Sequence, residues 1–211
     1  MVKVGKVLAV TALATVLVAQ EHAVSGFNVG VSGGVNKTQY KFGGSYNRNT
    51  VGLKAKKARF IAAIDLGYDV PFCDVWLAGI EARAGITVGK IKKSQTIAGV
   101  VANMTVKSAP FGALLLRGGY SVYQGGVLYA VFGPQLTKHK VQIAIPALRE
   151  SVARSKKKVQ FLGGLGFRHE FADWFIKLEY DHAFRKKVYT IDGINVKNSS
   201  HIFQLGVGWK A

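Results

Sequence analysis

The sequence predicts an all-β protein: an eight-stranded antiparallel up-and-down transmembrane β-barrel preceded by an N-terminal signal peptide. Three observations support this prediction. Eight segments alternate apolar and polar residues with the period of two that a β-strand requires. The connections between these segments are alternately short and long, and aromatic residues gather at the short-turn ends of the strands.

The alternation is clearest in residues 173–184. One face of this predicted strand carries Trp174, Ile176, Leu178, Tyr180, His182 and Phe184, and the other carries Lys177, Glu179 and Asp181. In a soluble β-sandwich the charged face would meet water, whereas in a membrane barrel it would line the interior. A single strand does not distinguish these two folds, so the rest of the chain has to.

The other alternating segments are distributed along the whole chain. Most have the length of about ten residues that a tilted strand needs to cross hydrocarbon. The segment 127–136 is the weakest of them, because both of its faces are apolar and Pro134 interrupts it. With the segment above, we expect strands at residues 27–35, 59–70, 76–88, 114–122, 127–136, 159–171, 173–184 and 203–210.

The connections separate into two classes. Residues 70–74, 123–126 and 171–173 form tight turns, whereas 38–57, 90–109, 138–158 and 185–199 are long and are expected to be loops. Short turns at one end and long loops at the other are typical of a membrane barrel. At the short-turn end we expect an outward-facing aromatic girdle of Phe27, Tyr68, Trp76, Tyr120, Tyr129, Phe171, Trp174 and Trp209.

The inward-facing positions of these strands carry acids and bases in equal number. A closed eight-stranded barrel has room only for side chains, and unpaired charges would be costly to bury. We therefore expect a lumen filled by salt bridges. The predicted network consists of Asp65, Glu81, Arg83, Arg117, Arg168, Glu179 and Asp181, with Asp69, Glu170, Arg59, Lys177 and Lys210 also facing inward.

The first residues are typical of an export signal. Lys3 and Lys6 precede a short apolar core at residues 7–19, which is too short to span a bilayer. We expect a signal peptide at residues 1–23, cleaved after Ala19 or Ala23, and a barrel domain at 24–211. An exported protein has little access to nucleic acid, so we expect no nucleic-acid partner.

The net charge of +18 comes from the long connections, which with Lys37 at their edge carry 21 basic residues and two acidic ones. Such an excess favours an anionic partner: outer-membrane lipid, lipopolysaccharide or a host glycan. No cofactor and no metal site is predicted. The candidate anion-binding residues lie near the ends of the strands: Lys54, Lys56, Lys57, Lys156, Lys157, Lys158, Lys186 and Lys187.

With its signal peptide, alternating strands and closing segment at residues 201–211, the chain resembles the small outer-membrane β-barrel proteins: the OmpA transmembrane domain, OmpX and the opacity-type surface proteins. The resemblance implies a bacterial outer-membrane location, periplasmic termini, extracellular loops and insertion by the barrel-assembly machinery. Members usually end in an aromatic residue; here Ala211 is last and Trp209 is the nearest outward aromatic residue. The implied role is a non-enzymatic surface protein acting in adhesion or membrane integrity.

Two alternatives remain. His182 and His201 are both expected to face outward near the long-loop rim, with Ser199 and Ser200 nearby. A histidine–serine pair there could attack an acyl ester, as in a lipid A-modifying hydrolase. The other alternative is a narrow diffusion pore, which a filled eight-stranded lumen would restrict.

Overall fold

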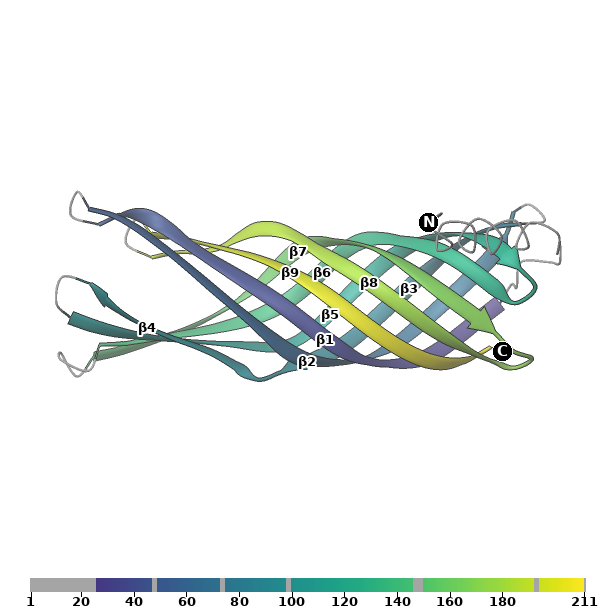
Figure 1. Cartoon of the computed structure of the whole chain (residues 1–211), viewed down its shortest axis with the longest axis horizontal. Coiled ribbons are helices and arrows are strands. Elements are labelled where there is room, and N and C mark those ends of the chain that lie inside the picture. Colours follow the sequence, from purple (N-terminus) through teal and green to yellow (C-terminus); the bar gives the residue numbers. More distant parts are fainter. Residues whose placement is uncertain are drawn as a thin grey trace, which may run out of the picture.

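Within the residues that the computed structural model describes, 26–46, 49–72, 75–97, 100–145, 150–191 and 194–210, antiparallel strands close into one elongated barrel (Figure 1). In the outer parts of several strands only the backbone is described. No helix in this part of the chain is long and apolar enough to cross a membrane. The strands are β1 (Gly26–Tyr46), β2 (Asn49–Pro71), β3 (Trp76–Val88), β4 (Lys90–Ile97), β5 (Val100–Tyr123), β6 (Gly126–Ile145), β7 (Glu150–Glu170), β8 (Trp174–Ile191) and β9 (Ile194–Lys210).

The nine elements form the eight-stranded wall that the sequence predicts, because β3 and β4 are two parts of one wall strand. Both pair with β5, β3 through Trp76↔Tyr120 and β4 through Lys90↔Lys107. Between them Gly89 has a φ of 113°, a left-handed conformation that glycine adopts without steric cost. The ring closes where β1 pairs with β9 and β3 pairs with β5, so within the described apolar band each wall strand has a neighbour on both sides.

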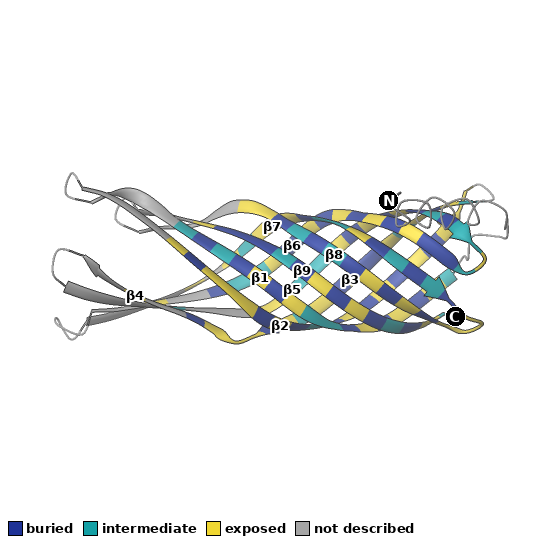
Figure 2. Cartoon of the chain, in the orientation of Figure 1, coloured by how far each residue is buried: buried dark blue, intermediate teal, exposed yellow. Residues whose placement is uncertain are grey.

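Side chains alternate between the two faces of this wall as the sequence predicts (Figure 2). On β8, Leu178 is 59% exposed on the outer face, while its neighbours Lys177 and Glu179 are 3% and 1% exposed in the lumen. The outward apolar positions of β9 run from Trp209 to Phe203. We take the height of the apolar band as the distance along the barrel axis from Trp209 to His201. With a rise of about 3.3 Å per residue and a strand tilt of about 40°, this height is about 20 Å, close to the hydrocarbon thickness that barrels span.

Aromatic side chains mark the short-turn end of the band. Trp76, Trp174 and Trp209 are all exposed on the outer face. The rings of Phe171 and Trp174 stack with centroids 3.9 Å apart, and Trp174 lies opposite Trp209 in the register of β8 and β9. This arrangement is typical of a girdle at a membrane–water interface.

The prediction for Tyr129 is wrong. Its side chain is buried in the lumen, where the hydroxyl donates to Glu179 at 2.9 Å. The segment 127–136 is apolar on both faces, so its alternation did not show which face is inward. Pro134 lies within β6 and does not interrupt it. The lumen is also less polar than predicted, since an apolar cluster that includes Ile61, Leu77, Leu115, Val131 and Leu162 fills part of it.

The prediction of long loops is also wrong. In the described part of the chain, most of residues 38–57, 90–109, 138–158 and 185–199 extend the strands as paired hairpins. Pairs continue to Tyr46↔Asn49 between β1 and β2, and to Ile145↔Glu150 between β6 and β7. The lysines suggested loops, but β-branched and aromatic residues alternate with them, and antiparallel pairing satisfies the backbone polar groups. The barrel thus continues beyond its apolar band as four hairpins, seen opposite the short turns in Figure 1.

Candidate functional site

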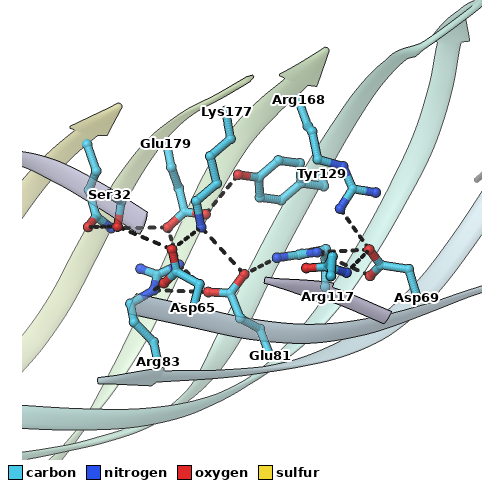
Figure 3. Close-up of polar contacts among 12 residues, drawn as sticks. Ser32, Asp65, Asp69, Glu81, Arg83, Arg117, Tyr129, Arg168, Lys177 and Glu179 are labelled. Atoms are coloured by element: carbon cyan, nitrogen blue, oxygen red, sulfur yellow. Dashed lines mark hydrogen bonds and ion pairs between the residues drawn. The ribbon is translucent and has the colours of Figure 1, made fainter. Parts of the chain in front are cut away.

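The lumen contains a connected network of ion pairs, centred on Arg83 (Figure 3). Its guanidinium group from β3 contacts four carboxylates from β2, β3 and β8. The distances are 2.9 Å to Asp65, 2.5 Å to Glu81, 2.5 Å to Glu179 and 2.8 Å to Asp181. Arg83 therefore links walls that lie on different sides of the barrel.

Further bases complete the network. Arg117 contacts Asp69 at 3.0 Å and also pairs with Glu81. Arg168 lies 2.8 Å from Asp69 and 2.7 Å from Glu170, and Lys177 lies 2.7 Å from Asp65. Lys210 contacts Glu170 at 3.1 Å near the short-turn end. Each member of the predicted interior network thus takes part in at least one ion pair.

Arg59 differs from the other interior bases in its described contacts. It donates to the Thr38 hydroxyl at 2.8 Å, above the ion-pair network. Nearby, Tyr40 and His139 meet at 3.3 Å between hydroxyl and Nδ1. A cavity of about 20 Å³ remains among these side chains, which is the space of one water molecule. At this level the lumen is polar and packed rather than open.

Basic residues form rows on the hairpins beyond the apolar band. In the backbone register, Lys187 on β8 lies opposite Lys197 on β9, Lys197 lies opposite Lys41 on β1, and Lys41 lies opposite Lys54 on β2. Four adjacent strands therefore carry lysine at one level. On the other wall Lys90, Lys107 and Lys140 are opposed in the same way on β4, β5 and β6. Directly opposed like charges destabilise a sheet unless an anion compensates them.

The structure distributes the predicted anion-binding lysines over two walls. Lys54, Lys56 and Lys57 lie on β2, and the Lys57 ammonium donates to the backbone carbonyl of Lys90 at 2.8 Å. Lys157 and Lys158 lie on β7, where Lys157 is opposite Lys138 of β6. Lys156, Lys186 and Lys187 lie on the strand backbones of β7 and β8, and their side chains are outside the described part of the chain. The lysines therefore form two groups and not one patch.

The electrostatic effect of this crowding is visible at Lys41, which lies beyond the apolar band. Repulsion by Arg185 is the largest cause that lowers the pKa of Lys41 from its ordinary value. Loss of hydration and the charges of Lys54, Lys56 and Lys197 act in the same direction. An anion bound among these side chains would remove part of that repulsion.

The two rim histidines are neighbours, as their predicted positions suggested. His182 lies opposite His201 in the register of β8 and β9, and their Nδ1 atoms are 3.3 Å apart. The Tyr180 hydroxyl is 2.7 Å from His201 Nδ1. Lys37 lies opposite His201 on β1, so the pair has a basic neighbour.

The serines are placed less favourably for the acyl-hydrolase alternative. Ser199 and Ser200 are each 5% exposed. Among the described residues, the hydrogen bonds of His201 go to Tyr180 and His182. A nucleophile needs an exposed hydroxyl that is hydrogen-bonded to its base, and neither serine has this arrangement here.

Comparison with known proteins agrees with this architecture. The family model for the outer membrane protein beta-barrel domain matches residues 7–210. The chain belongs to this outer-membrane barrel family. Membership supports a location in the bacterial outer membrane. Among curated protein sequences, none matches the chain.

Solved structures of other outer-membrane barrels share the fold. The outer membrane protein OprG of Pseudomonas aeruginosa is 13% identical, with a TM-score of 0.59, 92% of this chain covered and 99% of that one. The outer membrane protease OmpT of Escherichia coli is 10% identical, with a TM-score of 0.53 and coverages of 92% and 100%. Neisserial surface protein A is 13% identical, with a TM-score of 0.47 and coverages of 89% and 98%. At these identities the likeness to OprG and OmpT concerns the fold alone.

Sequence reasoning missed the opposed lysine rows. Lys41 and Lys197 were expected in separate loops, and their adjacency depends on where each hairpin turns and on how β1 pairs with β9. Tyr180 was assigned only an outward position. An indication was available in the sequence, because Lys41 and Lys54 are separated by a segment that contains Gly43, Gly44 and Gly52, residues common near turns.

Proposed function

We propose that this protein is a non-enzymatic surface barrel whose basic hairpins bind anionic lipopolysaccharide or host glycans, serving adhesion or membrane integrity. The hairpins face the cell exterior and the short turns face the periplasm in this proposal. The barrel-assembly machinery would insert the chain.

The observation that carries the proposal is the direct opposition of lysines across adjacent strands. Lys187, Lys197, Lys41 and Lys54 form one such row. Opposed cations lower the stability of the hairpins when no ligand is present, and a polyanion that bridges them raises it. The segments that were expected to be loops contain two acidic residues in the sequence, Glu150 and Asp192. Few carboxylates are therefore available there to neutralise the lysines.

The interior favours a structural barrel over a pore. Arg83, Arg117, Arg168 and Lys177 fill the lumen together with their carboxylate partners. In this proposal, ligands bind to the outer wall and to the hairpins and not inside the lumen. Salt weakens contacts of this kind. At 0.1 M ionic strength, small ions largely screen the attraction between exposed charges that are more than about 10 Å apart.

The test is binding of the refolded barrel to immobilised heparin and to lipopolysaccharide. Replacing Lys156, Lys157 and Lys158 together by Gln should lower the salt concentration needed for elution. The matched control replaces the same three residues by Arg, which keeps the charge. Binding that is indifferent to salt, or equal in the Gln and Arg variants, contradicts the proposal.

A further inference from the structure

A groove of about 570 Å³ lies on the outer wall of the barrel, formed by β8, β9, β1 and β2. It lies at the upper border of the apolar band. On β1, Lys37 is the next outward residue after Val35, and on β9, His201 is the next after Phe203. The lining side chains that matter here are Lys37, Gln39, Lys56, Tyr180, His201 and Phe203.

The polar side of this groove offers donors and no carboxylate. Lys37 and Lys56 are exposed and supply two ammonium groups. When the Tyr180 hydroxyl donates to His201 Nδ1 across their 2.7 Å contact, the ring proton is on Nε2, so that His201 is a further donor. Such a set of groups selects an anion, and it disfavours a metal cation at the histidine pair.

The lower side of the groove is apolar. Phe203 is 56% exposed, and its ring lies 4.8 Å from that of Tyr180. Below them continue Leu205 and Leu178, which are 60% and 59% exposed in the apolar band. A ligand that uses both sides of the groove is therefore amphiphilic.

A second step of positive charge lies farther from the membrane. Lys41 follows Lys37 by four residues on β1, which is about 13 Å along the strand and about 10 Å along the barrel axis. Lys54 and Lys197 lie beside it in the register. The wall thus presents cations at two heights above an apolar surface, which suits a head group with more than one anionic group.

We propose that this wall binds a phosphorylated glycolipid of the outer leaflet. Its phosphate lies between Lys37, Lys56 and His201, and an acyl chain runs along Phe203 and Leu205. Anionic groups farther along the sugar head group reach Lys41, Lys54 and Lys197. This lipid site deepens the proposed function, on which it rests, because it assigns one ligand class and one location to part of the basic surface.

The test measures lipid retained by the barrel in detergent micelles, by native mass spectrometry. The probes are a bisphosphorylated lipid A and its dephosphorylated form. The Lys37→Gln/Lys56→Gln variant should bind the phosphorylated lipid roughly thirtyfold more weakly than the wild type, as expected for two lysines at an anionic surface. The dephosphorylated lipid should bind the wild type and this variant equally weakly.

A matched control removes two opposed lysines from the other wall, Lys138→Gln/Lys157→Gln. This variant should retain the phosphorylated lipid as the wild type does. Phe203→Ser should weaken retention of the lipid but leave heparin binding unchanged, which separates the groove from general charge. Heat-resistant migration on gels verifies that each variant is folded.

Two outcomes would overturn the lipid site. Equal loss in the groove and control variants would mean that retention follows total charge, and the proposed function would survive without the groove. Equal retention of phosphorylated and dephosphorylated lipid by the wild type would remove the phosphate from the recognition. Loss of heparin binding in the Lys156–Lys158 variant does not bear on either outcome, so failure of the two proposals can be distinguished.

Discussion

Arg117 on β5 lies 3.0 Å from the carboxylate of Asp69 on β2, a strand with which β5 has no backbone pairing in the described part of the chain. The ion pair therefore reaches past β3, which lies between them in the wall, and joins two strands that do not pair with each other. Arg117 also pairs with Glu81 of β3. Removing this base leaves two buried carboxylates with fewer compensating charges.

We expect Arg117→Leu to destabilise the barrel by about 3–5 kcal/mol, the usual cost of removing one partner from a buried ion pair. Urea unfolding in micelles, followed by tryptophan fluorescence, measures the change. The control is Arg185→Leu, which removes the same side chain from an exposed position and should change stability by less than about 0.5 kcal/mol. Similar unfolding midpoints for both variants would show that the network does not stabilise the fold.

The filled lumen predicts a closed barrel. In planar bilayers the wild-type protein should give no large and steady single-channel conductance, because Arg83 and its four carboxylate partners occupy the interior. The double variant Arg83→Ala/Lys177→Ala should give more frequent or larger conductance events than the wild type. A large steady conductance of the wild type would favour the diffusion-pore alternative.

The proposed orientation is tested by thiol labelling on intact cells. Cysteines at Asn47 and Ser151 should react with a membrane-impermeant maleimide if the hairpins face outward: Asn47 falls between β1 and β2 in the sequence, outside the described residues, and Ser151 is the second residue of β7. Cys73 falls between β2 and β3 in the sequence, outside the described residues, and should react only after permeabilisation. Labelling of Cys73 without permeabilisation would reverse the orientation.

Protonation of Lys41 should be linked to anion binding. Its neighbours lower its pKa, and a bound anion raises it again, so binding takes up protons. Affinity for heparin should therefore fall as the pH rises through the lowered pKa of Lys41. In the absence of an anion, the same repulsion destabilises the charged form, and unfolding stability should rise over that pH range.

The comparison that isolates this effect is Lys41→Gln measured beside the wild type at neutral and alkaline pH. The variant should bind more weakly at neutral pH and show a smaller decline on going to alkaline pH. An identical pH dependence in the two proteins would assign the effect to other lysines.

The non-enzymatic proposal and the acyl-hydrolase alternative predict different effects of replacing His201. If the protein is non-enzymatic, wild type and His201→Ala should both release no fatty acid from lipopolysaccharide, measured by mass spectrometry of the lipid product. Fatty acid released by the wild type and lost in His201→Ala would establish an enzyme, with His201 acting as a base toward a nucleophile that rearranges on substrate binding.

Much of the fold could be predicted from alternation alone. Residues 173–184 fix the two faces of β8, and Lys177, Glu179 and Asp181 are inside as expected. Tyr129 could not be placed, because its segment is apolar on both faces. Pairing partners depend on hairpin register, which side-chain periodicity does not encode, so neither the contacts of Arg83 nor the opposition of Lys41 and Lys197 was available from the sequence.

The hairpin extensions were missed for a different reason. Lysine is uncommon in strands, and a lysine-rich segment therefore favours a loop assignment. Here residues such as Val106, Val141 and Ile143 occur in these segments, and the backbone pairs along them. Local composition did not show that the partner strand would continue beside them.

The pairing of β1 with β9 has a consequence for the timing of folding. Asn28 pairs with Lys210 at one end of this seam and Gly44 with Ile194 at the other. This edge of β1 therefore has no backbone partner until β9 is in place. Contacts that distant along the chain close slowly, because a long loop must be ordered before they form. Until β9 arrives, β1 carries an open row of backbone donors and acceptors that would pair with any exposed strand. The chain must therefore remain shielded until its last strand is available, and closure of this seam commits the barrel as a whole.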